Sequence, residues 1–198
     1  AGTFLIAAAI TRSTIGLFPC EPKHLKAVIK KLEYCGCKFE YSKNFLRIIP
    51  NQILNSVNIT TGPFPDFPTD LQAPFMALMT TTNGTSIIEE TVFENRMHHV
   101  KELNRMGANI TLRDNIATIV GVKKLQGRAV MGLDLRATAA LALAGLTANG
   151  KTIVRGLEHL ERGYEDFSKK LQAIGAKILK KNYVSNRKWI YEKYSYNS

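Results

Sequence analysis

The sequence predicts a mixed α/β (α+β) fold in which three similar units close into one pseudo-threefold prism around buried helices. The first observation is a repeat: glycines that follow a helical stretch recur at Gly36, Gly107 and Gly175, an interval of roughly 70 residues, which is longer than in common solenoids. The second is that each copy holds one helix that is apolar nearly all round and one that is amphipathic. The third is that short β-branched strands separate these helices.

The buried inner helices are predicted over 3–10, 71–81 and 135–148, where apolar residues occur on every side of the helix. A helix without a polar face is stable only when other elements cover all of it. We therefore expect these three helices to form the centre of the domain. The second begins at Thr69, whose hydroxyl is expected to act as the N-cap.

The outer amphipathic helices each carry one apolar stripe at spacings of three and four residues, typical of a helix that lies on a surface. Each is predicted to end at one of the repeated glycines, because glycine adopts the left-handed conformation of a helix C-terminus. The stripes are formed by Leu25, Val28, Ile29 and Leu32, by Met97, Val100 and Leu103, and by Tyr164, Phe167, Leu171 and Ile174.

Strands are predicted after each inner helix (14–18, 85–90 and 151–155) and after each outer helix (38–41, 109–112 and 177–180). A further strand precedes the second and third inner helices, at 57–60 and 128–131. The first copy shows no such strand, so we expect the chain to be a fragment of a longer protein. No linker interrupts the copies, so we predict one domain over 1–183, with repeats at 1–50, 51–121 and 122–183, and a basic, aromatic C-terminal extension at 184–198.

Composition excludes several classes of protein. With 198 residues, of which 45% are hydrophobic, the chain is expected to be globular, and its apolar runs are shorter than the roughly 18 residues that span a membrane. Three cysteines and four scattered histidines show no metal-site spacing, so we expect reduced thiols, a cytoplasmic location and no metal. The net charge of +11 is partly gathered in the extension. Nucleic-acid binding is the lesser interpretation of that segment, and a solvated terminal segment or strand is preferred.

Two acids stand where inner helices begin, Asp70 in the second copy and Asp134 in the third. Parallel inner helices would bring their N-termini, with free amides and positive dipole ends, to one end of the domain. Arg96, Arg136 and Arg162 lie near helix starts and are predicted to join them. Carboxylates among arginines suggest an anionic ligand with a hydroxyl to deprotonate. The alternative is that both acids only cap helices and that the arginines are surface residues.

Four motifs, in this order and spacing, resemble the enolpyruvyl transferases that act on UDP-N-acetylglucosamine, and the likeness covers about residues 1–182. The motifs are FPTDLQA at 67–73, ETVFENR at 90–96 followed by HV at 99–100 and LNRMGA at 103–108, DLRATA at 134–139, and RGYE at 162–165; the opening AGTFL also fits. The sister family of the shikimate pathway shares the fold. It would carry a Lys-Glu-Ser-Asp-Arg-like run at about 161–164, which this chain lacks.

The resemblance implies two domains, each of three βαβαββ units, with the active site in the cleft between them. The implied reaction moves the enolpyruvyl group of phosphoenolpyruvate onto a sugar hydroxyl of UDP-N-acetylglucosamine, the first committed step of peptidoglycan synthesis, and needs no metal or organic cofactor. This chain matches the second domain. The first would bring a Lys-Asn pair, further arginines and a mobile loop whose Cys or Asp protonates the substrate. None of Cys20, Cys35 and Cys37 matches that loop, so the chain alone is expected to be inactive.

The resemblance also implies roles for single residues. Asp70 is the candidate base for the reacting hydroxyl, Asp134 a second carboxylate for proton transfer at the intermediate, and Arg162 an arginine that holds phosphoenolpyruvate. The implied substrate-binding set is Asp70, Val92, Arg96, Arg136 and Arg162, with Val92 acting through its backbone. The alternative functions are a non-catalytic UDP-sugar-binding fragment and the shikimate-pathway enolpyruvyl transferase.

Overall fold

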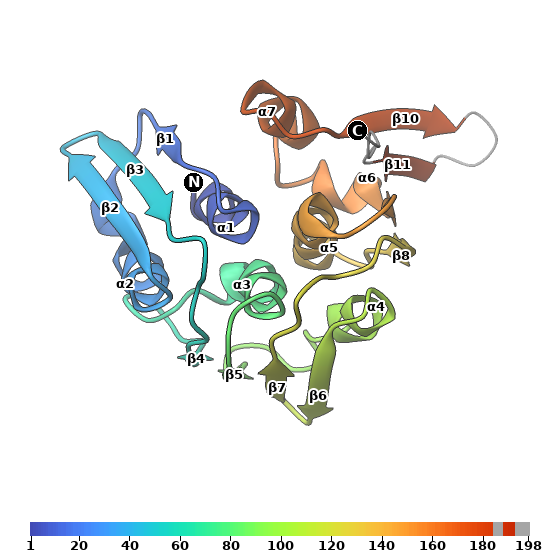
Figure 1. Cartoon of the computed structure of the whole chain (residues 1–198), viewed down its shortest axis with the longest axis horizontal. Helices are drawn as coiled ribbons and strands as arrows, with labels where there is room; N and C mark the ends of the chain where they lie inside the picture. The colour runs from blue at the N-terminus through green and yellow to red at the C-terminus, as the bar shows by residue number, and fades with distance from the viewer. Residues whose placement is uncertain (184–187, 193–198) are drawn as a thin grey trace.

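The computed structural model describes residues 1–183 and 188–192, and it has the mixed α/β architecture that the sequence predicts. At its centre lie the inner helices: α1 (Gly2–Thr11), α3 (Gln72–Met79, entered through the 3₁₀ turn η2 at Thr69–Leu71) and α5 (Leu135–Thr147). Figure 1 looks along them and shows them in the middle of the molecule, where each packs against the other two. Every residue of α3 is buried, as are most of α1 and α5, which confirms the prediction from their apolar composition.

Outer helices cover this centre: α2 (Lys26–Tyr34, entered through the 3₁₀ turn η1 at Pro22–Leu25), α4 (His99–Arg105) and α7 (Phe167–Ala173). Their predicted apolar stripes are largely buried, but the prediction for Ile174 is wrong. This residue lies just beyond the end of α7 and is 49% exposed. A short helix that the sequence did not predict, α6 (Leu157–Leu160), precedes α7. Across residues 1–183 and 188–192, no helix combines the length and apolar composition that crossing a membrane requires.

In the part of the chain that the structure describes, three sheets surround the helices, and their strand orders match. The second repeat has the order β4 (Ile59–Thr60), β5 (Thr85–Glu89), β7 (Ile116–Val120), β6 (Asn109–Arg113), and the third has β8 (Ala129–Met131), β9 (Ile153–Arg155), β11 (Lys188–Glu192), β10 (Leu179–Tyr183). The first has β1 (Ile15–Leu17), β3 (Phe45–Pro50), β2 (Cys37–Ser42), which is the same order without the leading strand. In both four-stranded sheets the leading pair is parallel and the other pairs are antiparallel. The matching orders confirm the pseudo-threefold fold.

The strands β3, β7 and β11 complete hairpins that the residue pattern did not predict, although the resemblance implied a second strand there. In β7 the side chains of Ala117 and Ile119 are buried, and those between and beside them are exposed. That alternation fixes the register, because a shift by one residue would turn the apolar side outward. The strand β11 lies within the segment that the sequence set apart as an extension, and it pairs with both β9 and β10.

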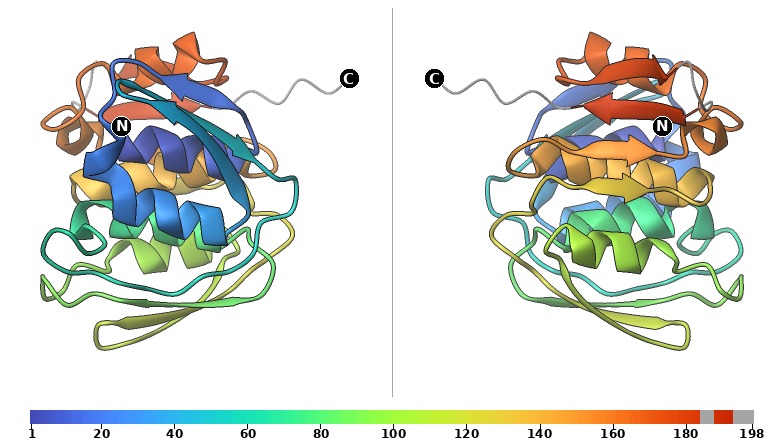
Figure 2. Two further views of the ribbon diagram at one scale, coloured as in Figure 1. Left: turned by 90° about the vertical axis from the view of Figure 1, so that its left-hand side faces the viewer. Right: turned by 90° about the vertical axis from the view of Figure 1, so that its right-hand side faces the viewer.

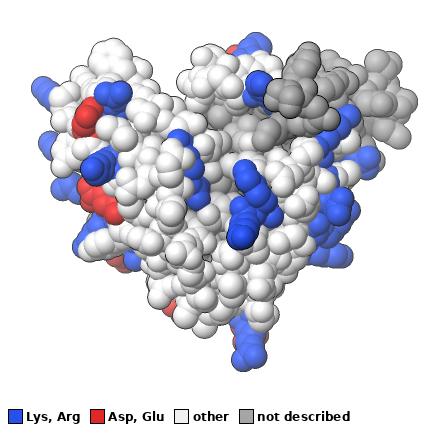
Figure 3. Space-filling model, in the orientation of Figure 1, with Lys and Arg blue, Asp and Glu red and all other residues white. Residues whose placement is uncertain are grey.

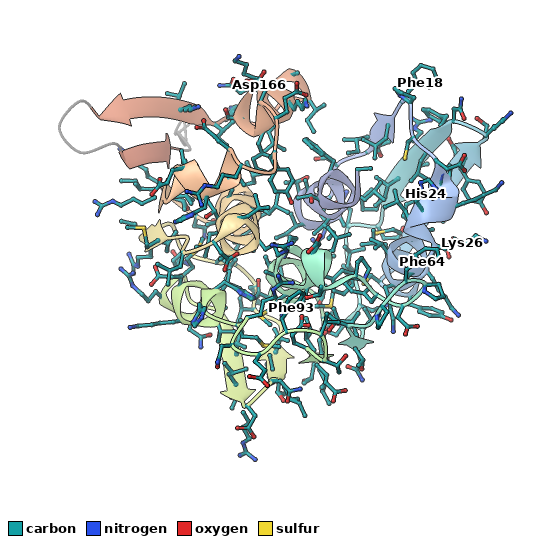
Figure 4. All side chains as sticks on the ribbon, turned by 180° about the vertical axis from the view of Figure 1, so that it is seen from behind. Phe18, His24, Lys26, Phe64, Phe93 and Asp166 are labelled. Atoms are coloured by element: carbon teal, nitrogen blue, oxygen red, sulfur yellow. The ribbon has the colours of Figure 1, made fainter. Side chains whose placement is uncertain are left out.

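The inner helices share one direction, so their starts lie at one end of the molecule and their ends at the other. Figure 2 shows them from two sides, lying across the molecule with strands and outer helices around them. We call the end formed by the turns that lead into these helices and by the loops after β1, β5 and β9 the helix-start face. Figure 4 looks onto it from behind. The opposite end is the helix-end face.

At the helix-end face, the side chain of Arg12 is hydrogen-bonded to the protein backbone. This residue is the C-cap of α1, with a φ of 56°. Its guanidinium donates hydrogen bonds to the carbonyl oxygens of Ala9 (2.9 Å), Ile10 (3.0 Å), Thr81 (2.7 Å) and Gln52 (3.3 Å). One side chain thus ties the end of α1 to the end of α3. Positive charge suits this end because helix C-termini carry partial negative charge, and Figure 3 shows Lys and Arg side chains standing over it.

Candidate active site

Asp70, Arg96 and Arg136 meet on the helix-start face, and we call them the acid–arginine cluster. The side chain of Asp70, in η2, is 64% exposed. Its Oδ1 accepts a hydrogen bond from Nε of Arg136 at 2.6 Å and also contacts Nη2 of the same guanidinium. Nη1 of Arg96 lies 3.8 Å from that oxygen. The structure therefore brings together three of the residues that the sequence singled out, because η2, the start of α5 and the loop after β5 meet on one face.

Asp134 uses its carboxylate on its own helix. Its Oδ1 accepts hydrogen bonds from the backbone amides of Arg136 (2.7 Å) and Ala137 (2.9 Å), so Asp134 is the N-cap of α5. Capping was the alternative that the sequence left open for both acids, and the structure shows it for Asp134 and not for Asp70. The cap also fixes the backbone from which the Arg136 side chain extends toward Asp70.

Thr69 does not cap its helix, so the predicted N-cap is wrong. Pro68 occupies the N-cap position of η2, and no side chain within residues 1–183 and 188–192 caps that turn. The Thr69 hydroxyl instead donates to Oε2 of Glu90 at 2.8 Å and accepts a hydrogen bond from Nη1 of Arg96 at 2.7 Å. Hydrogen bonds to charged groups are stronger than those to neutral amides, which explains why a distant carboxylate takes this hydroxyl from the local backbone.

Glu90 is a functional candidate that the sequence analysis missed. It directly follows β5 and is 2% exposed. Its Oε1 accepts hydrogen bonds from the Thr61 hydroxyl (2.8 Å) and from the amides of Val92 (3.0 Å) and Phe93 (3.2 Å). The available signal was the alternation of β5, which places Glu90 on the same inward side as Ser86 and Ile88. An acid at an inward position of a strand requires donors, and here two come from the loop that follows it and two from threonines 21 and 29 positions upstream.

The loop after β5 presents Val92, Phe93 and Arg96 to the site. Cζ of Arg96 lies 3.9 Å from the ring centroid of Phe93, a cation–π contact. Burial lowers the pKa of Arg96, and the guanidinium of Arg136 lowers it further, but an arginine remains protonated. Val92 is 39% exposed. Its amide is bonded to Glu90, and no residue in the described ranges donates to its carbonyl, so the carbonyl is the backbone group that Val92 offers.

Arg162 stands in the turn after α6, exposed and without a side-chain hydrogen bond or ion pair to any described residue. The turn is packed onto the helix starts. A Cβ on Gly163 would lie 2.5 Å from Cδ2 of Leu135, and Oη of Tyr164 lies 2.7 Å from Oγ1 of Thr3 at the start of α1. Burial raises the pKa of Tyr164. The structure thus places Arg162 on the helix-start face but does not bond it to the acid–arginine cluster.

A cavity of ≈ 800 Å³ opens beside Arg96, between α4 and the turn that joins β6 to β7. Cavities of ≈ 710 and ≈ 530 Å³ occupy the corresponding positions in the first and third repeats, between the outer helix and the hairpin. The groove is therefore a property of the repeated unit. The groove of the second repeat differs because Glu90, Phe93 and Arg96 line it, which makes it continuous with the cluster.

Two buried thiols and one buried imidazole stay uncharged at neutral pH. Burial raises the pKa of Cys35 to about 12 and that of Cys37 to about 11, so both thiols stay protonated at neutral pH. Burial lowers the pKa of His99 to about 4, so its imidazole stays neutral. Within the described ranges, no group of three or more His, Cys, Asp or Glu is placed to hold a metal ion. The charged groups that the structure brings into contact on this face are the Asp70 carboxylate and the guanidinium groups of Arg96 and Arg136.

The solved structures that match this arrangement define its class. The enolpyruvyl transferase NikO from Streptomyces tendae matches with a TM-score of 0.79 and 25% identity, over 88% of this chain and 42% of that one. The EPSP synthase from Acinetobacter baumannii matches with a TM-score of 0.69 and 16% identity, over 96% of this chain and 44% of that one, a likeness of fold alone. The three-unit fold is that of an enolpyruvyl transferase domain.

The family model for EPSP synthase (3-phosphoshikimate 1-carboxyvinyltransferase) matches residues 1–171, and the chain belongs to that family. Among curated relatives, the UDP-N-acetylglucosamine 1-carboxyvinyltransferase 2 of Prochlorococcus marinus is 61% identical over 90% of this chain. The UDP-N-acetylglucosamine 1-carboxyvinyltransferase of Nostoc sp. is 55% identical over 91%. The chain spans 42% and 40% of the length of these two relatives.

Proposed function

We propose that this chain supplies one domain of an enzyme that transfers the enolpyruvyl group of phosphoenolpyruvate to a hydroxyl of UDP-N-acetylglucosamine, the first committed step of peptidoglycan synthesis. The observation that carries the proposal is the exposed Asp70 carboxylate between two guanidinium groups at the starts of the inner helices. The relatives at 55–61% identity carry that activity in their names, which supports the same acceptor here.

The proposed chemistry uses the cluster as base and anion site. Asp70 takes the proton of the sugar hydroxyl while the hydroxyl oxygen bonds to the central carbon of phosphoenolpyruvate. The methylene carbon takes a proton from an acid on the other domain of the longer protein, so that a methyl group forms. Arg96, Arg136 and the unbonded Arg162 hold the carboxylate and phosphate of that substrate, since guanidinium groups form paired hydrogen bonds with both anions. Asp134 has one oxygen engaged by helix amides and moves a proton through the other. Loss of phosphate and of a methyl proton then restores the double bond.

Exposed apolar side chains on the helix-start face support the proposal of a partner domain. Large apolar side chains stand exposed on the loops around the cluster: Phe64 is 82% exposed, Phe18 78%, Leu133 60% and Phe93 50%. Figure 4 shows the three phenylalanines on this side of the molecule. Apolar side chains grouped around charged residues are typical of a surface that another domain or a ligand covers. We propose that residues 1–183, together with the strand β11 that pairs with β9 and β10, form a single domain, and that a second domain of the longer protein closes over this face.

Two further parts of the proposal concern place and acceptor. The cysteines Cys20, Cys35 and Cys37 are all free, which supports a reducing cytoplasmic location. The family description names a phosphorylated shikimate as acceptor, but solved EPSP synthases share only 16% identity with this chain. We therefore favour the nucleotide sugar over shikimate 3-phosphate.

The test is phosphate release from phosphoenolpyruvate by the purified chain, alone and with the remaining part of a relative supplied as a separate chain. We expect no release by the chain alone, and release that requires UDP-N-acetylglucosamine when both parts are present. Turnover by the chain alone would contradict the need for a second domain. Release with shikimate 3-phosphate but not with the nucleotide sugar would reassign the acceptor. Tight sugar binding without turnover by the combined parts would favour a non-catalytic binding module.

A further inference from the structure

Glu90 is a charged side chain buried beside the acid–arginine cluster, and its burial requires an explanation. Taking a carboxylate out of water costs several kcal/mol unless hydrogen bonds and charges replace its hydration. Here four donors do so: the hydroxyls of Thr61 and Thr69 and the amides of Val92 and Phe93, at 2.8–3.2 Å. They come from the end of β4, from η2 and from the loop after β5. One carboxylate therefore fixes three separate segments of the helix-start face.

The direction of donation between Glu90 and Arg96 is set by chemistry. An ionised carboxylate only accepts hydrogen bonds, and a threonine hydroxyl has a single proton to give. Thr69 gives that proton to Oε2 of Glu90, so its lone pairs are turned toward Nη1 of Arg96, which donates to them at 2.7 Å. Each hydrogen bond in such a chain polarises the next. The Thr69 hydroxyl thus links the Glu90 carboxylate to the Arg96 guanidinium in one hydrogen-bonded chain.

Arg96 is held on two sides by groups that depend on Glu90. Thr69 bonds its Nη1, and the ring of Phe93 lies 3.9 Å from its Cζ, while the Phe93 amide itself donates to Glu90. Glu90 has a fixed backbone because its amide donates to the Asn115 carbonyl (2.9 Å) and its carbonyl accepts from Nδ2 of Asn115 (2.7 Å). The position of Arg96 beside Asp70 therefore depends on the β6–β7 turn, through the backbone of Glu90.

We propose that Glu90 is a positioning residue of this active site, which sets Arg96 through Thr69 and sets the backbone of Val92 and Phe93 for substrate binding. The proposal rests on the proposed function, because it treats Arg96 and Val92 as substrate-binding groups. The Glu90 side chain is enclosed by protein donors, so its carboxylate acts on a ligand through the residues that it holds. A purely structural Glu90 would change stability alone, whereas a positioning residue changes ligand affinity in a manner that depends on Arg96.

The first arm of the test measures affinity of the full chain for UDP-N-acetylglucosamine by calorimetry. Glu90→Gln is expected to weaken binding about tenfold, because charged hydrogen bonds to the cluster are lost. Glu90→Gln combined with Arg96→Ala should lose less affinity than the sum of the two single losses, because part of the effect of Glu90 passes through Arg96. Glu90→Gln within twofold of the parent, or fully additive losses in the double variant, would overturn the proposal. Glu102→Gln is the matched control: its partly buried carboxylate pairs with Arg105 and the Met131 amide, and its removal should leave affinity unchanged.

Thr69 supplies a second pair of variants should Glu90→Gln fold poorly. Thr69→Val keeps the shape of the side chain and removes the hydroxyl, so it should weaken binding about as much as Glu90→Gln. Thr69→Ser keeps the hydroxyl and should lose much less affinity than Thr69→Val. Equal losses in the two variants would show that the hydroxyl does not carry the effect, and would contradict the proposed chain from Arg96 to Glu90.

The second arm needs no ligand and separates this inference from the proposed function. Hydrogen exchange by NMR should show protected amides at Val92 and Phe93 and a slowed Arg96 guanidinium in the parent chain. All three should exchange faster in Glu90→Gln and remain unchanged in Glu102→Gln. If the parent chain binds no nucleotide sugar but this pattern holds, the proposed function fails and the positioning of Arg96 stands. If these groups exchange alike in parent and Glu90→Gln, the positioning role is wrong whatever the chain binds.

Discussion

The two ends of the inner helix bundle both use arginine, and they use it in opposite ways. At the helix-end face, Arg12 gives its hydrogen bonds to four backbone carbonyls, which belong to the main chain and cannot rotate away as a side chain can. At the helix-start face, Arg136 and Arg96 face the exposed side chain of Asp70. Side-chain partners can rotate away and be replaced by an anion. The same residue type therefore serves stability at one end and remains open to exchange at the other.

The electrostatics of the helices explain the difference. The ends of α1 and α3 carry partial negative charge, so a cation such as Arg12 is stabilised there by the backbone itself. The starts of α3 and α5 carry partial positive charge, which repels guanidinium groups. Arg96 and Arg136 are held there by carboxylates, Glu90 through Thr69 and Asp70 directly. An anionic substrate would find a site where both dipoles and side chains favour it.

The largest expected effect tests whether the helix-start end is the chemical one. Asp70→Asn keeps the size of the side chain and removes its capacity to take a proton. In the combined two-part enzyme, phosphate release should fall about 10³-fold, as for loss of a general base. Thermal unfolding of the chain should hardly change, because the Asp70 side chain is largely exposed. A loss of less than tenfold in rate would remove Asp70 from the role of base.

The second prediction is acid sensitivity that originates at His99 on α4. The pKa of this histidine is about 4 in the folded chain against an ordinary 6.5; burial lowers it, Asp134 opposes the shift and His98 adds to it. The unfolded chain therefore binds the extra proton between these values. Above pH 6.5 the shifted pKa of His99 does not reduce the free energy of unfolding. As the pH drops toward 4, the free energy of unfolding falls, by about 3 kcal/mol in total.

Urea unfolding across this pH range measures the effect. His99→Phe should flatten the slope between pH 4 and 6.5, whatever its offset in absolute stability. His24→Gln, a change at an exposed histidine, should keep the parent slope. An unchanged slope in His99→Phe would assign the acid sensitivity to other groups.

The third prediction concerns the helix-end face. In Arg12→Ala, the four carbonyl oxygens lose their hydrogen-bond donor and must bond to water instead. We expect the free energy of unfolding to fall by about 2 kcal/mol. Urea denaturation measures this loss. Arg47→Ala, which removes an exposed ion pair with Glu40, should cost less than about 0.5 kcal/mol. Equal losses in the two variants would show that the ends of α1 and α3 do not depend on Arg12.

The smallest effect separates capping from chemistry at Asp134. Asp134→Ala should lower the free energy of unfolding by about 1 kcal/mol, because the first amides of α5 lose their acceptor. Asp134→Asn should keep most of that stability, since asparagine is also a good N-cap. If Asp134 transfers a proton, Asp134→Asn still loses turnover in the combined enzyme. Full turnover in Asp134→Asn would reduce this residue to a cap.

The sequence predicted what depends on local pattern. The inner helices followed from apolar residues on every side, and the contact between Asp70 and Arg136 followed from helix starts that share one end. The strands β3 and β7 were missed because short apolar runs do not by themselves distinguish strand from buried helix. Local chemistry also misled at Thr69, where a good N-cap residue bonds to Glu90 instead.

What the sequence could not predict depends on partners far apart in the chain. Glu90 meets Thr61, 29 positions upstream, and Arg12 meets Thr81, 69 positions downstream. No periodicity connects such pairs, and each becomes visible only when the sheets and helices have been assembled. Arg162 shows the limit from the other side. Its side chain is exposed and bonds no described residue, so the structure does not indicate what it binds, and its role stays a prediction.

The cap of α5 has a mechanical consequence. The carboxylate of Asp134 and the backbone of Arg136 are bonded within one helical turn. The spacing between this acid and the base of that guanidinium side chain is therefore set by the geometry of a single turn, and not by how the three repeats pack. When α5 shifts or tilts, Asp134 and the backbone of Arg136 move together, while Asp70 is joined to them through the Arg136 side chain and the packing of α3 on α5. A movement of α3 relative to α5 would therefore change the position of Asp70 with respect to both residues at once.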